Sequence, residues 1–485
     1  MKNLQTKDIE KPSLPKFLKL LSVVTVLERI SYYGVRTLLV LFLIEHFGFQ
    51  DVRAYGIYSL FSAFSYAGPV ISGILADRFF GYQKMIIIGG LTILIGQFFI
   101  MLGCFNLTIF FLGIGMLVIG TGFMKSTSNT LLGECYEKYD NTQAVKGFTI
   151  FHVAVNVGAA ISSIICGYIS YLYGWFAGFT IPFIAIAISI GIFMKNLHVF
   201  GNSGLVIKPN VINKKIGAIS IANWGLIGTI GLGIISGYIM LYSVAYESIF
   251  SCFGILMFIF FISVFIKSNE RKNLLILLFF VLNFLIFSGI LMQLGCWLLL
   301  FSERNVAQSF IGMTIPSSVS QSLNPVAIIL FGSLVAKIST KRYEYSRFVL
   351  GLASVSLCFL LLYYGCFYAV NNIVSYWYFL IAVLITGVGE LIVWPFVQYQ
   401  ITSLSPNNLK GFMMGFVMLS ISFSNVLGIY LAKFASVDNL NGKIDMANSL
   451  AIYQSSFLKV ALYYTIFLLL CLPILFLIKR STLKK

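Results

Sequence analysis

Long apolar segments follow one another along almost the whole chain, and short stretches rich in Gly, Pro, Asn and charged residues separate them. A helix needs about 20 mostly apolar residues to cross a bilayer. Segments of this length without interruption exclude a transmembrane barrel and predict an all-α polytopic membrane protein. We expect fourteen spans, near residues 17–45, 54–76, 83–105, 107–134, 144–172, 175–197, 216–241, 245–266, 273–302, 307–337, 346–369, 373–403, 409–435 and 449–478.

A polar stretch near the middle of the chain, residues 201–215, predicts a boundary between two halves. Its Gly, Pro, Asn and Lys content is typical of a linker. Six predicted spans precede it, and the two spans that follow it lack interior charge. We therefore expect a six-helix N-terminal half at 1–200, a linker with two extra helices at 201–270, and a six-helix C-terminal half at 271–485.

Composition and charge support a membrane protein. Of the 485 residues, 59% are hydrophobic and 10% are charged, and no soluble globular protein of this size would tolerate that balance. The net charge of +17 could indicate a nucleic-acid partner. The predicted spans instead place most Lys and Arg residues in loops on one side, which is the cytoplasmic side by the positive-inside rule. We expect a protein of the cytoplasmic (inner) membrane with both termini cytoplasmic and no nucleic-acid partner.

Three full charges in the first predicted span need an explanation. Glu28, Arg29 and Arg36 lie in a segment that is otherwise apolar. In a helix, Arg29, Tyr33 and Arg36 share one stripe, so they can all face the protein interior. One interpretation is a structural ion pair or an anchor that extends to the membrane surface. The other, which we favour at this depth, is a pathway for substrate or protons.

A short loop with paired charges lies between the second and third predicted spans, Gly73-Ile-Leu-Ala-Asp-Arg-Phe-Phe-Gly-Tyr-Gln-Lys84. It resembles the signature loop of the major facilitator superfamily, whose two six-helix halves rock about a site at the midplane. The resemblance implies the major facilitator fold. It also implies that Asp77 and Arg78 act in conformational latching, without contact to substrate. The alternative is an ordinary charged turn.

Further motifs resemble one branch of that superfamily, the proton-dependent oligopeptide transporters. Glu28-Arg-Ile-Ser-Tyr-Tyr-Gly34 is similar to the family motif ExxERFxYYG. Other similar stretches are Gly120–Lys125, Phe151–Gly158, Gln293 with Phe301–Asn305, Ser322–Pro325, Gly389–Pro395 and Met413–Gly415. Their shared order along the chain supports the resemblance, and two extra helices between the halves are a feature of bacterial members.

The substrate that this resemblance implies matches the charges of the predicted spans. A short peptide is a zwitterion, so its site needs a cationic pole and an anionic or carbonyl-rich pole. The candidate binding residues are Arg36 and Lys125 for the carboxylate, Asn156, Asn324 and Glu390 for the ammonium, and Tyr33 and Tyr66 as further hydroxyls. The resemblance implies the same roles for these residues.

The resemblance also implies that Glu28, Arg29, Lys125 and Glu390 take part in proton coupling and gating. Each candidate has a structural alternative. Lys125 and Glu28 could form a static bridge. The two asparagines could simply bond across helices, a contact worth about 0.6–2 kcal/mol in membranes. His152, at the position of a motif tyrosine, could be a neutral hydrogen-bonded ring without a proton role.

The chain departs from the family mainly at acidic positions. Thr25 replaces the first glutamate of ExxER, and Met292 replaces the glutamate of a Glu-Gln pair. Ser288 and Val417 stand where tryptophan is common, and Trp394 replaces a serine. Because methionine cannot exchange a proton, coupling would depend on the glutamates that remain.

Two functional hypotheses follow. The first is a secondary active transporter, functional as a monomer, that imports di- and tripeptides with protons by alternating access. The second is a facilitative or differently coupled transporter of another zwitterionic or anionic solute. A membrane enzyme or receptor is not supported, since the sequence has no nucleophile–base pair, no metal-ligand spacing and no phosphate-binding glycine loop. No cofactor or metal is expected.

Overall fold

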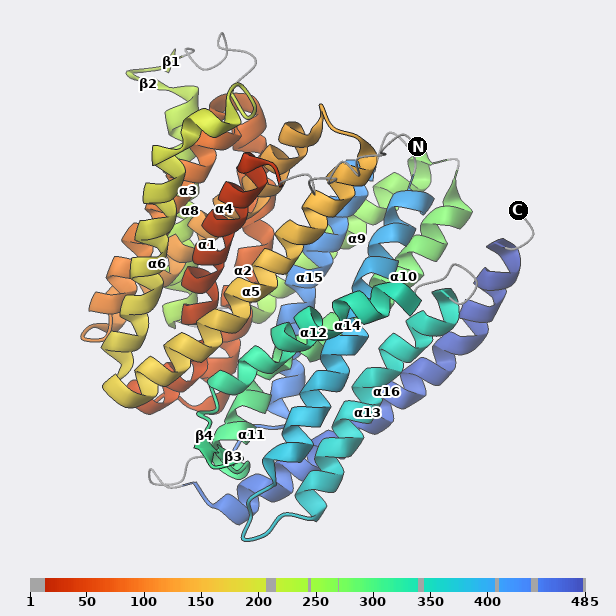
Figure 1. The fold of residues 1–485 in the computed structure, drawn as a ribbon. Helices are drawn as coiled ribbons and strands as arrows, with labels where there is room; N and C mark the ends of the chain where they lie inside the picture. Colours follow the sequence, from red (N-terminus) through yellow and green to blue (C-terminus); the bar gives the residue numbers. More distant parts are fainter. Residues whose placement is uncertain are drawn as a thin grey trace, which may run out of the picture.

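The structure of the chain, a computed structural model, describes residues 14–205, 215–242, 246–268, 270–338, 344–405, 410–437 and 444–482 (Figure 1). The α-helices are α1 (Lys16–Leu41), α2 (Asp51–Leu75), α3 (Tyr82–Leu102), α4 (Leu107–Tyr136), α5 (Asn141–Tyr173), α6 (Trp175–Lys195), α8 (Ile221–Tyr242), α9 (Tyr246–Lys267), α10 (Arg271–Leu291), α11 (Trp297–Asn305), α12 (Leu323–Ile338), α13 (Glu344–Phe367), α14 (Tyr376–Leu404), α15 (Lys410–Lys433) and α16 (Met446–Thr482). Short helical turns are η1 (Phe42–His46), η2 (Ala76–Phe80), η3 (Leu197–Phe200), η4 (Met292–Gly295) and η5 (Val319–Ser322). The strands are β1 (Lys215–Ile216), β2 (Ile219–Ser220), β3 (Ser309–Phe310) and β4 (Met313–Thr314).

These elements form fourteen helical segments in the described part of the chain, as the apolar pattern predicts. α10 continues through η4 into α11 as one segment, and η5 continues into α12 as another. Among the described residues, ten helices are long and apolar enough to cross a membrane by length and composition alone. The prediction of an all-α polytopic membrane protein is confirmed.

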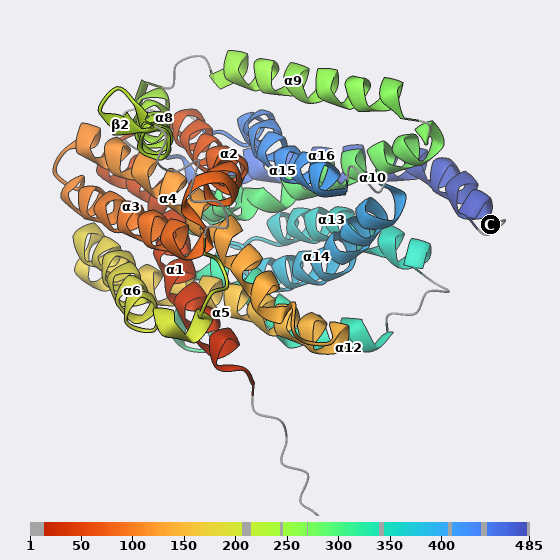
Figure 2. The ribbon, with the colours of Figure 1, turned by 90° about the horizontal axis from the view of Figure 1, so that it is seen from above.

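The helices gather into two groups (Figure 1). α1 to α6 pack together with α8 on one side, and α10 to α16 form the other group. The groups meet where α2 packs on α15 and α5 packs on α12. α9 lies along the outside of the bundle (Figure 2). This is the major facilitator arrangement of two six-helix halves with two extra helices, whereas the part boundaries at 1–200, 201–270 and 271–485 stay a prediction.

The two ends of the bundle differ in what they contain. At one end α1 leads into α2, and β3 and β4 lie there too (Figure 1). We call it the hairpin end. At the other end α2 leads through η2 into α3, so the predicted signature loop lies there. We call it the η2 end.

The predicted span at 307–337 begins too early. β3 and β4 form an antiparallel hairpin there, and α12 begins only at Leu323. Ile311 and Gly312 have φ angles of +51° and +76°, and positive φ at both central residues is typical of a tight hairpin turn. The apolar residues of the hairpin concealed it within the hydropathy pattern. In the same way, the span predicted from 216 begins with the β1–β2 hairpin, and α8 starts at Ile221.

A second difference lies inside the predicted span at 273–302. α10 ends at Leu291, the tighter turn η4 follows, and α11 begins at Trp297. Gly295 lies against the side chain of Tyr58 from the other half, and a Cβ atom at this position would be 2.7 Å from the Tyr58 Cζ. The break and the glycine therefore let Tyr58 of α2 approach η4 at the point where Arg36 also lies.

Candidate functional site

Arg36 connects the two halves at the centre of the predicted site. Its Nε donates to the Tyr58 hydroxyl at 2.9 Å, and its Nη2 donates to the Met292 Sδ at 2.9 Å. The guanidinium carbon also lies 5.6 Å from the ring centroid of Tyr33 and 5.5 Å from that of Tyr58, which are cation–π distances. A thioether is a weak acceptor, so Arg36 keeps most of its capacity to bind an anion.

Lys125, on α4, lies over the ring of Tyr66 on α2, with its Nζ 3.7 Å from the ring centroid. Two glycines allow this approach. A Cβ atom at Gly122 would be 2.8 Å from the carbonyl carbon of Gly68, so the α2 and α4 backbones meet where neither residue has a side chain. The aromatic face stabilises the ammonium without neutralising it, and the charge of Lys125 remains available to a carboxylate.

Glu28 and Arg29 form a buried ion pair in α1. The Arg29 Nε lies 2.7 Å from the Glu28 Oε2, and both side chains are at most 5% exposed. Within the described residues, the second carboxylate oxygen of Glu28, Oε1, has no hydrogen-bond partner. A buried acceptor without a partner costs about 1–3 kcal/mol, which favours a role in which Glu28 gains a proton or a second partner. Gly158 of α5 packs directly on Arg29, with an added Cβ atom only 2.6 Å from the Arg29 Cβ.

Glu390 and Asn324 form the polar pair of the C-terminal half. The Asn324 Nδ2 donates to the Glu390 Oε2 at 3.1 Å and so joins α12 to α14. Both side chains are half-buried. A hydrogen-bonded carboxylate in the half opposite Arg36 is the acceptor that the predicted site requires.

The cationic and anionic groups lie in one region. Lys125 interacts electrostatically with Arg29, Glu28 and Arg36, all in the N-terminal half. Arg36 in turn interacts with Glu390 across the interface between the halves. The structure therefore brings together charges that lie as much as 362 positions apart in the predicted set, from Glu28 to Glu390.

Asn156 shows a local contact only. Its Nδ2 donates to the backbone carbonyl of His152 at 3.1 Å within α5, although the side chain is buried. His152 itself is exposed. The substrate role of Asn156 and the proton role of His152 therefore stay predictions.

Asp77 and Arg78 lie in η2, at the end of the bundle remote from the β3–β4 hairpin, and both are exposed. The Tyr82 hydroxyl donates to the Asp77 Oδ1 at 2.7 Å, so the loop is bonded to the first turn of α3. From this location we do not expect Asp77 or Arg78 to contact the charged residues of the predicted site. Their latching role stays a prediction, and the side chains of Met413–Gly415 lie outside the described residues.

The residues that depart from the family pattern make neutral contacts inside the helical bundle, and Met292 lies against the charged cluster. Met292 occupies the position next to the Arg36 guanidinium. The Ser288 Oγ donates to the Ser424 Oγ at 3.1 Å, and Val417 is fully buried. The Trp394 ring lies 4.9 Å from that of Phe284. Thr25 is buried in α1 one turn before Arg29. These residues contribute packing and neutral hydrogen bonds at positions where the family pattern has glutamate, tryptophan or serine.

Tyr58 is a site residue that the sequence analysis missed. It lies eight positions before Tyr66 on α2, so the two side chains project from the same face of the helix. That spacing is a usable signal in the sequence, because Tyr66 is itself a candidate binding residue. Tyr58 holds the Arg36 guanidinium on one side while Met292 contacts the other.

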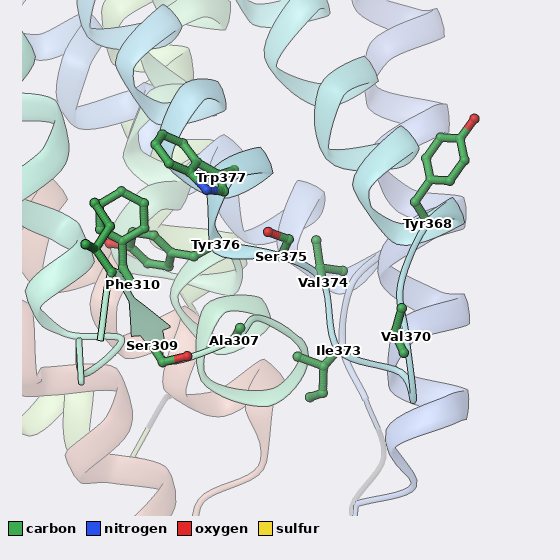
Figure 3. Close-up of a pocket in the computed structure, with 11 residues that line it drawn as sticks. Ala307, Ser309, Phe310, Tyr368, Val370, Ile373, Val374, Ser375, Tyr376 and Trp377 are labelled. Carbon is green, nitrogen blue, oxygen red and sulfur yellow. The ribbon is translucent and has the colours of Figure 1, made fainter. Parts of the chain in front are cut away.

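The cavity drawn in Figure 3 lies elsewhere. It has a volume of about 410 Å³ and is open to the surface between the β3–β4 hairpin and the start of α14. Phe310, Tyr376 and Trp377 form its aromatic wall. Among the described residues, those lining it include no member of the predicted site, so it has no role in the argument for substrate binding.

Comparisons with known proteins agree with this arrangement. A family model described as PTR2: POT family matches residues 83–446. The dipeptide and tripeptide permease A of Escherichia coli (strain K12) is 26% identical over 470 residues, which cover 92% of this chain and 89% of that protein. The dipeptide and tripeptide permease B of Aeromonas hydrophila subsp. hydrophila is 25% identical over 459 residues, which cover 92% of this chain and 90% of that protein.

The fold is also similar to solved structures. A structure of a bacterial homologue of the human drug peptide transporters PepT1 and PepT2 matches with a TM-score of 0.83 and 25% identity, over 96% of this chain and 98% of that one. The sequence motifs, the two-half fold and the family match all point to the same family. Because the family match spans most of the chain, this protein belongs to the POT family.

Proposed function

We propose that this protein is a secondary active transporter that imports di- and tripeptides with protons by alternating access. The single observation that supports it most is that Arg36 of one half and Glu390 of the other lie near enough to interact electrostatically. A zwitterion placed between them would contact both halves at once. The names of its relatives, dipeptide and tripeptide permeases, give the substrate class independently of the geometry.

In this proposal the two poles of the site bind the two ends of the peptide. Arg36 and Lys125 hold the carboxylate, since neither cation has a carboxylate within hydrogen-bonding distance among the described residues. Glu390, with Asn324 and Asn156, holds the ammonium. Tyr33 and Tyr66, which lie against the two cations, supply further hydroxyl groups.

Proton coupling in this proposal depends on two glutamates that bind protons, Glu28 and Glu390, and on a change in the ion-pair partner of Lys125. Glu28 has a buried oxygen without a hydrogen-bond partner in the described residues, and Glu390 lies beside the peptide ammonium. Lys125 interacts with Glu28 and Arg29, so a change of protonation at Glu28 would alter the partner of Lys125. The resulting exchange of partners would couple the proton to the movement of the halves.

A second candidate function rests on the contact between Arg36 and Met292. The Met292 thioether lies 2.9 Å from the Arg36 guanidinium, and because a thioether has no titratable proton, Met292 cannot exchange a proton there. This favours a facilitative or differently coupled transporter of another zwitterionic or anionic solute. The two candidates share the site and differ in the substrate and the driving force.

We also propose a location and an orientation. The charge distribution supports the cytoplasmic (inner) membrane with both termini cytoplasmic, so that the hairpin end faces outward. A single chain contains both poles of the site, which supports function as a monomer. Labelling of a cysteine at position 105, at the hairpin end, by an impermeant reagent on intact cells tests this orientation. Protection from the reagent would reverse it.

Ligand-dependent melting of the purified protein tests the substrate. A dipeptide should raise the melting temperature in a concentration-dependent way, because a ligand that binds only the folded state stabilises it. The same dipeptide with an amidated carboxyl end or an acetylated amino end should stabilise the protein much less. Stabilisation by an amino acid, nitrate or a nucleoside, and by no peptide, would replace the first candidate with the second.

Replacing Met292 with glutamate should give the Arg36 guanidinium a carboxylate partner in place of the neutral thioether. The new carboxylate would compete with the carboxylate of the peptide, so we expect peptide affinity at neutral pH to fall about tenfold, equivalent to about 1.4 kcal/mol. Protonation of the introduced group at low pH should restore the affinity. Met292→Gln, which has similar length and no charge, is the control, and an equal loss in both variants would contradict the explanation. Isothermal titration at two pH values measures the effect.

A further inference from the structure

The open cavity at the hairpin end has an apolar lining. None of the eleven described residues around its volume of about 410 Å³ has a charged side chain. Three aromatic rings form one wall (Figure 3). The Phe310 ring centroid lies 4.7 Å from that of Trp377 and 5.3 Å from that of Tyr376. Because the rings pack on one another, the wall is formed before any ligand binds.

Few polar side-chain groups are available inside the cavity. The Tyr376 hydroxyl is hydrogen-bonded to the Oγ of Ser320, a buried residue outside the lining, at 3.0 Å. Tyr368 lies at the rim, and its hydroxyl points away from the other lining residues (Figure 3). Ser309 and Ser375 supply the other hydroxyl groups. An ordered water needs about two to four polar partners, so this lining favours an apolar ligand over bound water.

The base of the cavity is a backbone pairing between the chain after α11 and the chain before α14. The Val374 N–H donates to the Asn305 carbonyl at 2.7 Å, and the Ala307 N–H donates to the Val374 carbonyl at 2.9 Å. Val370 and Ile373 exchange backbone hydrogen bonds of 3.0 Å around a tight turn. The two residues between them have φ angles of +53° and +64°, as such a turn requires. The base therefore forms without a ligand.

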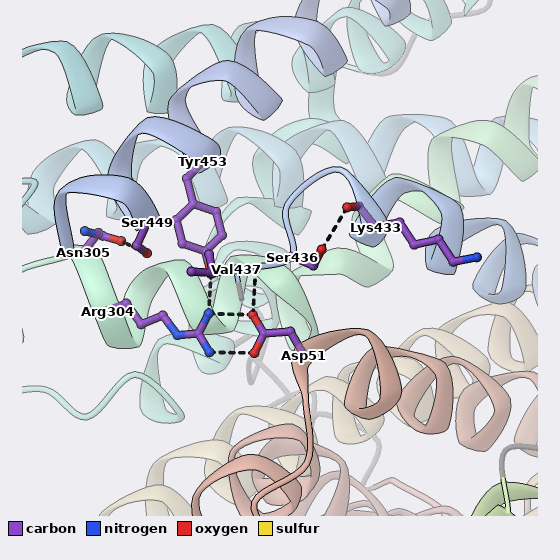
Figure 4. Close-up of polar contacts among 8 residues, drawn as sticks. All are labelled: Asp51, Arg304, Asn305, Lys433, Ser436, Val437, Ser449 and Tyr453. Carbon is purple, nitrogen blue, oxygen red and sulfur yellow. Dashed lines mark hydrogen bonds and ion pairs between the residues drawn. The ribbon is translucent and has the colours of Figure 1, made fainter. Parts of the chain in front are cut away.

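Side-chain contacts fix the end of α11, which leads directly into this base (Figure 4). The Arg304 Nη1 and Nη2 donate to the Asp51 Oδ2 and Oδ1 of α2 at 2.6 and 2.7 Å. The Asn305 Nδ2 donates to the Asn372 carbonyl at 3.0 Å. The Ser449 Oγ of α16 donates to the Asn305 Oδ1 at 2.7 Å. The base is thus attached to α2 and to α16, and the cavity is pre-organised in this conformation.

An exposed apolar stripe of α13 leads to the cavity. Both α13 and α14 are long and apolar enough to cross a membrane. On α13, Leu350, Leu357 and Tyr364 follow one another at intervals of seven residues, and each is more than half exposed. This spacing places them on one face of the helix, which therefore faces lipid. α13 ends one residue before Tyr368, so the lipid-facing stripe ends at the rim of the cavity.

The rim has the composition of a membrane–water interface. Tyr368, after α13, and Trp377, in the first turn of α14, are both exposed, and these two residue types are enriched where a membrane meets water. The rim also exposes aliphatic side chains, since Ile311 is 76% and Val370 is 72% exposed. Exposed apolar side chains that lie together are typical of a surface that contacts a membrane. The cavity therefore opens where lipid headgroups meet acyl chains.

We propose that this cavity binds a phospholipid of the leaflet at the hairpin end, with the upper part of one acyl chain against the aromatic wall. The uncharged lining, the continuity with the α13 stripe and the interfacial rim all support this occupant. A dipeptide is disfavoured, because its two charged ends would find no charged partner among the described lining residues. The inference depends on the membrane location of α13 and α14 and is independent of peptide transport.

Photolabelling in a bilayer tests the site. The full chain is reconstituted in dioleoyl phosphatidylcholine vesicles that contain a phosphatidylcholine with a diazirine near the ester end of one acyl chain. After illumination, mass spectrometry compares the labelling of Phe310 in the wall with that of Ile381, which is exposed on α14 one turn after Trp377. We expect comparable labelling of Phe310 and Ile381. Labelling of Ile381 without labelling of Phe310 would overturn the proposal, since lipid would then be outside the cavity only.

Two variants and a matched control separate the cavity from the general lipid-facing surface. Ala307→Trp fills the space with an indole ring, so the Phe310-to-Ile381 labelling ratio should fall at least about tenfold, equivalent to about 1.4 kcal/mol. Ser309→Glu, at an exposed position of β3, introduces a carboxylate without a cationic partner among the described lining residues, and it should lower the ratio even if Ala307→Trp folds poorly. Tyr364→Trp adds the same ring outside the cavity and should leave the ratio within about twofold. Equal ratios in all three variants, or loss of Phe310 labelling when a dipeptide is added, would overturn the proposal.

Discussion

Replacing Arg36 with alanine is expected to lower kcat/KM for dipeptide uptake about 100-fold, which corresponds to about 2.7 kcal/mol. The expected loss is large because Arg36 would make charge-assisted hydrogen bonds to the peptide carboxylate in a buried site. Its present partners, the Tyr58 hydroxyl and the Met292 thioether, are both neutral. Initial uptake rates in proteoliposomes measure the effect.

Arg53→Ala is the matched control for Arg36. The Arg53 guanidinium donates to the Leu241 carbonyl at 2.8 Å and lies 3.9 Å from the Phe49 ring centroid, away from both poles of the site. Its removal should leave kcat/KM within about twofold of the native value, as expected of a surface substitution. A C-amidated dipeptide adds a second check, since Arg36→Ala should then cause little additional loss. Equal losses for free and amidated peptides would assign Arg36 a structural role.

Replacing Glu390 with glutamine is expected to lower kcat/KM at least about tenfold for peptides with a free amino end. Glutamine keeps an acceptor oxygen for the Asn324 amide, so the local geometry should persist while the negative charge is lost. N-acetylated peptides, which have no ammonium, should be affected far less. The proton dependence of uptake should also weaken, because Glu390 is one of the two proposed proton carriers.

Glu270→Gln is the matched control for Glu390→Gln, because it makes the same substitution at another glutamate that accepts a hydrogen bond from an asparagine. The Asn273 Nδ2 donates to the Glu270 Oε2 at 3.0 Å, so this pair repeats the Asn–Glu contact at an exposed position before α10. Uptake by Glu270→Gln should be unchanged. If Glu390→Gln transported free and N-acetylated peptides with equal loss, the ammonium would have another partner, and Asn156 would be the first to examine.

The approximate positions of the helices could be predicted, because each helix is a long apolar segment of the sequence. α8 and α9 are mostly apolar, and their predicted bounds agree with the structure to within five residues. The β3–β4 hairpin could not be predicted, since Phe310, Ile311 and Met313 have the composition of a membrane span. The break at η4 could not be predicted either. It follows from the approach of Tyr58 to Gly295, and a contact between distant residues leaves no local signal in the sequence.

The charged residues of the site could be found because a charge within an apolar span is conspicuous. Glu28, Arg36 and Lys125 were identified on that basis, and the structure places them in one electrostatic cluster. The Asp51–Arg304 pair was missed since both residues lie at the ends of helices, where charges are ordinary. Their partnership spans 253 positions, so only the packing of the halves reveals it.

Uptake of a labelled dipeptide into proteoliposomes, with and without an inward proton gradient, tests the central claim most directly. We expect the gradient to drive accumulation above the external concentration, and an ionophore that collapses the gradient to abolish it. Arg36→Ala should lower the initial rate of peptide uptake about 100-fold both with and without the gradient. Peptide uptake that only equilibrates, whatever the gradient, would contradict proton coupling, and the absence of any peptide uptake by the folded protein would contradict peptide transport itself.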